Sequence, residues 1–409
     1  MNSRRIRKSY CAIAIAAAAM MLASCGSSTP GTPAAGEVDV RKLDVGNYST
    51  APLDFRFTYN PRLATGKQLA LMRLADHVAT GLEIDARFKY SNGLVPLADP
   101  TAAIELLADA NKPVLERNGM LFGLGAGSSE RTPGKDNKPP ADSAFSTIVV
   151  LQFPTEGAAR QAATEIENID FSVAADRNER VPLSNYPQAR SHWRPGVSTI
   201  GSTMARGHYV INLYIGQPDA DVKGLAALAE KAYDAEVPLL DALKPLTLDE
   251  TLRLDYDPDG MLRRTLNLEG FGTPDFQNQL ILGQRGFLHE TLDQNYWKRL
   301  AADVGLDRYA LSANGPRNTS KVVRTRDSDA AKTLASKILE QNYPGVADSP
   351  ANVPESKCGE GRSDQFEYQD KRFRCVVRYR QYVATVESAQ LTDAHQRAAA
   401  QYALLANNQ

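Results

Sequence analysis

The feature that most constrains the fold is a pattern that occurs twice in the chain. Residues 155–166 (TEGAARQAATEI) and 327–338 (DSDAAKTLASKI) match at an offset of 172, with alanines and a final isoleucine in the same places. Each segment follows a β-branched run and opens on an N-cap residue, Thr155 or Asp327. Apolar residues then recur three and four apart, which predicts a helix with one buried face.

A second match lies downstream of the first. HYVINLYIGQ, starting at His208, parallels QYVATVESAQ, starting at Gln381, at an offset of 173. Both runs precede Ala-rich helical patterns, at 219–235 and 392–406. Two matches at nearly one offset indicate an internal duplication. The alternative is the general likeness of any two α/β domains.

Each copy is expected to contain a strand, a helix, a polar excursion, a two-stranded hairpin and a closing helix. This order predicts an α+β fold of two duplicated α/β sandwich domains. Each domain would be a mostly antiparallel sheet with helices on one face. The expected domains span residues 37–245 and 255–409, separated by a segment that starts at Lys244-Pro245.

The N-terminus has the pattern of a secretory signal peptide over residues 1–24. Four basic residues come first, and an apolar run of 14 residues follows from Tyr10 to Ala23. A membrane-spanning helix needs roughly 20 apolar residues. A basic start and a short apolar stretch favour an exported precursor over a buried helix of the fold.

The end of that run, Leu22-Ala23-Ser24-Cys25, resembles the lipobox of bacterial lipoproteins. In that family the signal peptide is cut before the cysteine, whose thiol is diacylglycerated. The resemblance implies a lipidated Cys25 on the extracytoplasmic face of the cell membrane, where two acyl chains give stable anchoring. Residues 25–36 would then be a flexible Gly/Ser/Pro linker. A soluble secreted protein cleaved after Ser24 is the alternative.

The net charge of the mature chain limits the classes of partner that we expect. Removal of residues 1–24 leaves 43 basic and 48 acidic residues, a net charge of about −5. No basic stripe with interleaved aromatic residues is visible, so nucleic acid is not an expected partner. The expected partners are the membrane, through the lipid anchor, and an envelope lipid or protein ligand.

The other two cysteines of the mature chain, Cys358 and Cys375, are predicted to form a disulfide, because disulfides persist in an export compartment. A metal site would need further soft ligands, and no histidine lies between the two cysteines. At the offset of 173, the first copy has Asn185 and Ser202 in the matching places.

Candidate catalytic and cofactor motifs are incomplete. GLGAGSS (123–129) has the glycines of a phosphate loop, but a proline-rich segment follows where a helix is required. Asp255, Asp257 and Asp259 begin a calcium loop whose twelfth position is Leu266, so a turn is predicted there. The five histidines form no zinc motif, and Gly-x-Ser-x-Gly is absent from the sequence. We therefore expect no catalytic residue, no metal, no cofactor and no enzymatic activity.

Three further stretches, at 41–50 (RKLDVGNYST), 73–85 (RLADHVATGLEID) and 257–266 (DPDGMLRRTL), resemble an actinobacterial lipoprotein family of unknown function. The resemblance implies a lipobox, a linker and two related α/β domains. The paired strand–helix units are more loosely similar to extracellular sensor domains of mycobacterial-type receptor kinases. Neither resemblance implies an active site.

The expected role is non-catalytic binding of a ligand or protein, in a cleft between the copies that the polar segment 126–143 would cover. An envelope hydrolase with a dispersed active site and a structural spacer are the alternatives.

Overall fold

The computed structural model describes residues 38–53, 59–267, 274–276, 278–314, 318–364 and 369–408. The predicted signal peptide, Cys25 and linker lie outside these residues. Among the described helices, none combines the length and the apolar character that a membrane span requires.

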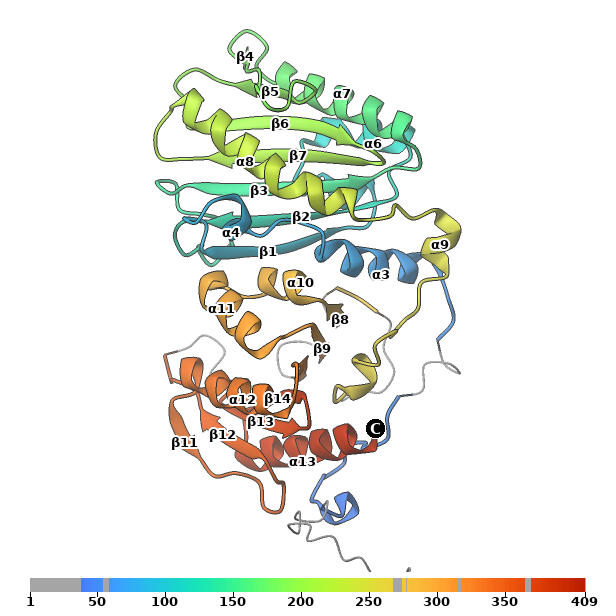
Figure 1. Ribbon diagram of the computed structural model, residues 1–409, viewed down its shortest axis with the longest axis vertical. Coiled ribbons are helices and arrows are strands. Elements are labelled where there is room, and N and C mark those ends of the chain that lie inside the picture. The colour runs from blue at the N-terminus through green and yellow to red at the C-terminus, as the bar shows by residue number, and fades with distance from the viewer. Residues whose placement is uncertain are drawn as a thin grey trace, which may run out of the picture. The chain divides into compact units, whose positions relative to one another are not determined.

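The first sheet has seven antiparallel strands in the order β1-β2-β3-β7-β6-β5-β4 (Figure 1). Its strands are β1 (Tyr90–Leu97), β2 (Phe122–Ser129), β3 (Phe145–Gln152), β4 (Glu179–Arg180), β5 (Arg190–Trp193), β6 (Thr199–Arg206) and β7 (Tyr209–Gly216).

The second sheet also has seven antiparallel strands, in the order β8-β9-β10-β14-β13-β12-β11. Its strands are β8 (Gln279–Leu282), β9 (Arg308–Asn314), β10 (Asn318–Arg324), β11 (Gly345–Ala347), β12 (Ser356–Glu360), β13 (Phe373–Tyr379) and β14 (Tyr382–Ser388). The two orders match strand for strand, from β1 with β8 to β4 with β11. The predicted duplication and the α+β class are confirmed.

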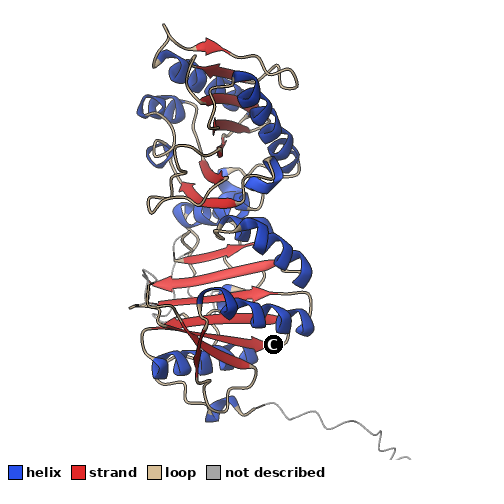
Figure 2. Cartoon of the chain, turned by 90° about the vertical axis from the view of Figure 1, so that its left-hand side faces the viewer, coloured by secondary structure: helices blue, strands red, loops and turns tan. Residues whose placement is uncertain are grey.

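Helices flank the strands of both sheets (Figure 2). The helices of the first copy are α3 (Leu63–Ala75), α4 (Gly81–Ile84), α5 (Pro100–Ala103), α6 (Lys112–Arg117), α7 (Glu156–Ser172) and α8 (Val222–Asp241). The later ones are α9 (Leu248–Leu252), α10 (Gln284–His289), α11 (Gln294–Val304), α12 (Ser328–Asn342) and α13 (Leu391–Asn407). Short 3-10 turns are η1 (Val40–Lys42), η2 (Asp109–Asn111) and η3 (Leu262–Arg264). Below, the first copy is residues 63–241 and the second copy is residues 279–407.

The two predicted N-caps are confirmed. The Thr155 side chain accepts a hydrogen bond from the Ala158 backbone N–H at 3.0 Å, and Asp327 accepts one from Ala330 at 2.8 Å. Both caps satisfy an N–H group that the first turn of a helix leaves unpaired. Local sequence therefore determines where α7 and α12 begin.

The helices cover both faces of each sheet, which corrects the prediction of one covered face. Val149 and Leu151 of β3 pack with α7, whereas Ile148 and Val150 lie in the core cluster that contains α8. Figure 1 shows α8 crossing β3, β7 and β6. Successive side chains of a strand point to opposite faces, so the continuous apolar run 148–151 requires cover on both sides.

The second copy follows the same plan. Ala330 and Leu334 of α12 share a core cluster with Val323 of β10. On the opposite face, Gln401 of α13 accepts a hydrogen bond from Ser320 of β10 at 2.7 Å. The two helices of each copy therefore enclose the sheet between them.

The segment before the first copy is bonded to the second. Tyr48 donates a hydrogen bond to Asp393 of α13 at 2.5 Å and accepts one from Arg397 at 3.1 Å. Asn407 Nδ2 donates to the carbonyl oxygen of Thr50 at 2.9 Å. The chain therefore contacts α13 before it builds the first sheet.

Candidate functional site

Each copy has a pocket at the same place on its sheet, on the face that α7 or α12 covers in part. The first pocket has a volume of about 360 Å³ and the second about 330 Å³. Asn212 in the first pocket and Thr385 in the second occupy matching places, as do Gly201 and Arg374. The duplication therefore produced two related cavities whose side chains now differ.

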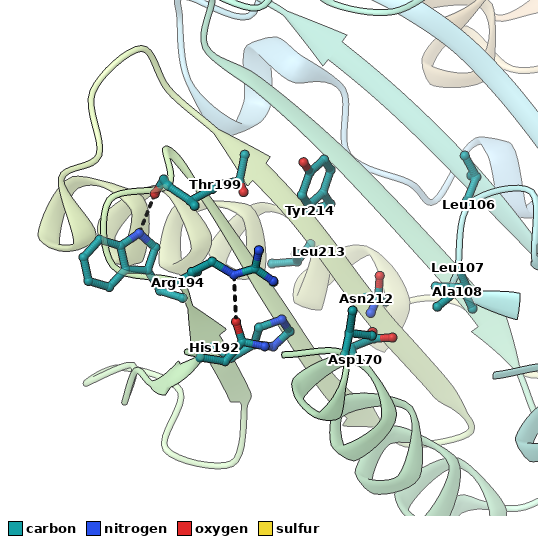
Figure 3. A pocket seen from close by; sticks show the side chains of 15 residues that line it. Leu106, Leu107, Ala108, Asp170, His192, Arg194, Thr199, Asn212, Leu213 and Tyr214 are labelled. Carbon is teal, nitrogen blue, oxygen red and sulfur yellow. Dashed lines mark hydrogen bonds between the residues drawn. The ribbon is translucent and has the colours of Figure 1, made fainter. Parts of the chain in front are cut away.

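Polar side chains form one side of the first pocket (Figure 3). Asp170, near the end of α7, accepts a hydrogen bond from Asn111 Nδ2 at 2.8 Å, and burial raises the pKa of its carboxyl group. Arg194 Nε donates to Asn178 Oδ1 at 3.4 Å. Within the part of the chain that the structure describes, no carboxylate forms an ion pair with Arg194.

A buried carboxylate holds His192 beside these groups. Glu167 of α7 is fully buried, and its Oε1 accepts a hydrogen bond from Arg180 and lies 2.8 Å from His192 Nδ1. Burial raises the pKa of Glu167. The His192 ring lies directly against the Gly201 backbone. A Cβ atom added to Gly201 would lie only 2.8 Å from the ring. The Glu167 contact leaves Nε2 of the ring for the pocket.

Apolar side chains line the rest of the pocket. Tyr214 of β7 is 51% exposed, and Leu106, Val173 and Val197 are also exposed. The Tyr214 ring packs against Phe145, with 5.3 Å between ring centroids. A half-exposed aromatic ring supported from behind is a rigid surface on which a ligand can pack.

The glycine-rich segment 123–129 forms strand β2, not a phosphate loop. A Cβ atom at Gly125 would lie 2.1 Å from Leu106. The absence of a side chain at Gly125 therefore makes room for Leu106, which lines the first pocket. Of the predicted cover 126–143, the first four residues belong to β2 and the rest form a loop. This loop lines neither the first pocket nor the junction pocket described below.

The second pocket is more aromatic and more highly charged. Trp297 and Tyr309 both contact Phe287, and Leu334 and Ile338 of α12 form the opposite wall. Its polar end includes Arg374, which pairs with the buried Glu387. The basic group at this point of the second pocket is thus held in an ion pair.

A third cavity, the junction pocket, lies between the copies, as the cleft hypothesis expected. It measures about 580 Å³, and Asp76, His77 and Glu83 line it from the first copy. Asp76 accepts hydrogen bonds from the backbone N–H groups of Gly283 and Gly286 at 2.8 and 2.9 Å. Arg285 pairs with Glu83 at 3.0 Å. The charged side chains of the junction pocket mainly join the two copies.

The predicted disulfide between Cys358 and Cys375 is present and joins β12 to β13. The register corrects one of its two counterparts in the first copy. Ser202 does match Cys375, but the residue that matches Cys358 is Ser191, not Asn185. The excursion before the hairpin differs in length between the copies, so the offset falls to 167 there. Ser191 and Ser202 form a 2.7 Å hydrogen bond where the second copy has the disulfide.

The Asp-Pro-Asp-Gly segment forms the predicted turn. Asp257 accepts hydrogen bonds from the backbone N–H groups of Leu262 and Arg263, and Asp259 pairs with Arg308. Gly260 adopts a φ of +64°, which favours glycine.

The histidines occupy separate places. His77 ends α3 with a bond to the Arg73 carbonyl oxygen, and the buried His289 contacts the Val78 carbonyl oxygen at 3.0 Å. His208 and His395 also contact backbone carbonyl oxygens. His192 is thus the histidine held by a buried carboxylate.

Sequence reasoning did not find the first pocket. Glu167 and Asp170 are one helical turn apart, but His192 and Arg194 follow after a long excursion and Tyr214 lies on another strand. The available signal was an acidic pair near the end of a helix, which also occurs on ordinary solvated faces.

Comparison with known proteins gives two family matches. A domain of unknown function, DUF7373 N-terminal, matches residues 57–256, and DUF7373 C-terminal matches residues 261–408. Among solved structures, the extracellular domain of PknH from Mycobacterium tuberculosis is similar at 12% identity and a TM-score of 0.31. That match covers 45% of this chain and 99% of that one. None of the curated proteins compared matches this chain.

Proposed function

The chain belongs to the DUF7373 family, whose function is unknown, and we propose that it is a non-catalytic cell-envelope protein that binds a ligand in its first pocket. The observation that carries this proposal is a concentration of exposed apolar side chains. Nine large apolar side chains are exposed among the described residues, and Leu106, Val173, Val197 and Tyr214 all line this one pocket. Such clusters mark binding sites on soluble domains.

The polar side of the pocket supports the same proposal. Arg194 and Asp170 are charged groups without an ion-pair partner among the described residues, and both line a concave surface. A ligand in the cavity could form hydrogen bonds with both groups. A spacer would have no use for this arrangement.

A hydrolase is the second candidate, because the Glu167–His192 pair resembles the base and its orienting group in such enzymes. That chemistry needs a nucleophile within hydrogen-bond reach of the histidine. No Ser, Thr or Cys side chain of the described residues bonds to His192. The pair therefore supports a role in holding His192 at the pocket.

Native mass spectrometry of the protein purified from its own envelope tests binding. Ala108 lies at the pocket, while Ala110, two residues on and also exposed, is not among the lining residues. Ala108→Trp should remove a co-purified mass that the parent and Ala110→Trp retain. A parent without bound mass, or an Ala108→Trp variant that retains it, would contradict the proposal.

Anchoring through Cys25 is part of the same proposal and is supported by the lipobox sequence. Cys25→Ser should leave the signal peptide uncut and the diacylglyceryl group absent, which intact-mass measurement of the membrane fraction detects. Processing and membrane association equal to those of the parent would exclude a lipid anchor.

A further inference from the structure

Building on the proposed function of the first pocket, we infer that its ligand is a carbohydrate of the envelope. The geometry that carries this inference is a row of planar polar side chains facing an exposed aromatic surface across one small cavity (Figure 3). Sugar rings offer hydroxyl groups along their edges and C–H groups on their faces, and the two sides of the pocket match these two surfaces.

The polar row contains both donors and acceptors. Arg194 has N–H groups beyond the one bonded to Asn178, Asp170 accepts, and Asn212, whose Nδ2 donates to Thr203 Oγ1 at 2.8 Å, offers its amide oxygen as an acceptor. His192 lies between Arg194 and Asp170 in Figure 3, with Nδ1 engaged by Glu167. A hydroxyl group donates one hydrogen bond and accepts others, so neighbouring hydroxyls of one ring need such mixed partners.

The apolar side matches the face of a ring. Tyr214 is 51% exposed and rests on Phe145, so its orientation is set before a ligand arrives. Leu106, which lies against Gly125, and Val197 contribute further apolar surface to the pocket. An aromatic ring and small apolar groups can cover the C–H face of a sugar without competing for its hydroxyls.

The polar groups are also held in place. Glu167, fully buried, orients His192, and Trp193 Nε1 donates to the Val197 carbonyl oxygen at 2.6 Å. Asn111 and Asn178 hold Asp170 and Arg194. A preorganised site loses less side-chain entropy on binding, which matters for a ligand held mainly by hydrogen bonds.

The second pocket is the internal contrast. At the strand positions of Gly201 and Tyr214, the second copy has Arg374 and Glu387, which pair with each other, and of these two Arg374 lines the second pocket. Its lining also includes the aromatic Trp297 and Tyr309 and the charged Glu290, Asp293 and Lys321. The second pocket therefore lacks the exposed aromatic floor, and we assign the sugar to the first pocket.

The chain supplies its own reporters, because its two tryptophans lie one in each pocket. In full-length protein carrying Trp297→Phe, fluorescence reports on Trp193 and hence on the first pocket. Trp193→Phe gives the matching reporter of the second. Maltose, cellobiose, lactose, mannobiose and diacetylchitobiose are titrated into both, with free amino acids as the competing class. We expect a saturable change of Trp193 emission with at least one disaccharide.

A second arm covers sugars outside this panel. An aqueous envelope extract is added before and after periodate oxidation, which cleaves vicinal diols, with excess periodate quenched by ethylene glycol. We expect the untreated extract to change Trp193 emission and the oxidised extract to do so at least tenfold more weakly. An equal response to both extracts, or a response to amino acids and to no saccharide, overturns the carbohydrate while leaving ligand binding intact. No response of Trp193 to any probe overturns the inference, while native mass spectrometry still tests the proposed function separately.

Variants locate the effect. Arg194→Ala should weaken binding about tenfold or more, because a charged group loses its hydrogen bonds to the ligand. Tyr214→Ala should act similarly through the lost face contact. Arg160→Ala, an exposed arginine at the opposite end of α7, is the matched control and should bind like the parent. Equal affinity of Arg194→Ala, Tyr214→Ala and the control overturns the assignment to this pocket.

Discussion

In both copies a basic side chain lies opposite a glycine of the neighbouring strand, at the same point of the sheet. The strand that carries the basic residue differs between the copies. In the first copy His192 on β5 faces Gly201 on β6, and in the second Gly359 on β12 faces Arg374 on β13. The acidic partner also differs in origin, since Glu167 comes from helix α7 and Glu387 from strand β14.

This difference in charged residues decides which pocket has an exposed aromatic ring on its strands. Glu387 and Arg374 satisfy each other, and the position that matches Glu387 in the first copy is the exposed Tyr214. Because the strand register is the same, the difference at these matched strand positions comes from their side chains. A duplicated scaffold therefore carries a structural ion cluster in one copy and the proposed ligand site in the other.

The largest expected effect is the loss of the second copy's ion cluster. Arg374→Ala leaves the buried Glu387 without its main partner and should lower the free energy of unfolding by up to about 5 kcal/mol. The first-copy change His192→Ala should cost far less, because Arg180 still pairs with Glu167. Guanidinium unfolding midpoints of both variants test the comparison. Equal losses would show that the two clusters are equivalent.

The two copies should also respond oppositely to pH. Burial raises the pKa of Glu236 in α8 to about 8, whereas Arg374, Lys321 and Lys371 overcome the effect of burial and lower the pKa of Glu387 to about 2. Glu236 therefore contributes stability that is complete below its unfolded pKa, near 4.5, and is lost as pH rises through 8. Glu387 contributes stability above pH 4.5 that is lost as pH falls toward 2.

Glu236→Gln isolates the first of these effects. The variant should match the parent near pH 4.5 and exceed its free energy of unfolding by about 4 kcal/mol at pH 9. Unfolding curves at several pH values measure it. Parallel pH dependences for parent and variant would contradict the raised pKa.

The disulfide of the second copy should contribute slightly less to the free energy of unfolding than the Glu236→Gln change does at pH 9. Replacing both Cys358 and Cys375 by serine reproduces the Ser191–Ser202 pair of the first copy. The free energy of unfolding should fall by about 3 kcal/mol, because the unfolded chain regains the freedom of an 18-residue loop. The control is the parent protein measured under oxidising and reducing conditions, and an unchanged midpoint in the double variant would count against this value.

The smallest expected effect is on the matched helix caps. Thr155→Ala and Asp327→Ala each remove one side-chain bond to a backbone N–H and should cost about 1 kcal/mol. Asp327→Ala should cost slightly more, because a carboxylate also interacts favourably with the helix N-terminus. Thermal unfolding of the two variants tests this order, and a cost in one copy alone would show that α7 and α12 are held differently.

Part of the architecture could be predicted because it is local. The caps at Thr155 and Asp327, the helical spacing after them and the paired strands are encoded within short windows. The disulfide could be predicted from an even cysteine pair in a chain whose N-terminal sequence predicts export. The unbroken apolar run 148–151 also indicates cover on both sheet faces, whereas the order of strands and helices by itself predicts cover on one face.

The sequence by itself determined the duplication, the α+β class and the Cys358–Cys375 pairing, because each rests on a repeated or local pattern. Only the tertiary structure decided that Ser191, not Asn185, is the counterpart of Cys358, since strand register depends on the length of the excursion before it. The first pocket, too, was decided only by the tertiary structure. Its side chains, from Leu106 to Tyr214, come from separate elements, and it is the pairing of β5, β6 and β7 under α7 that brings them to one cavity.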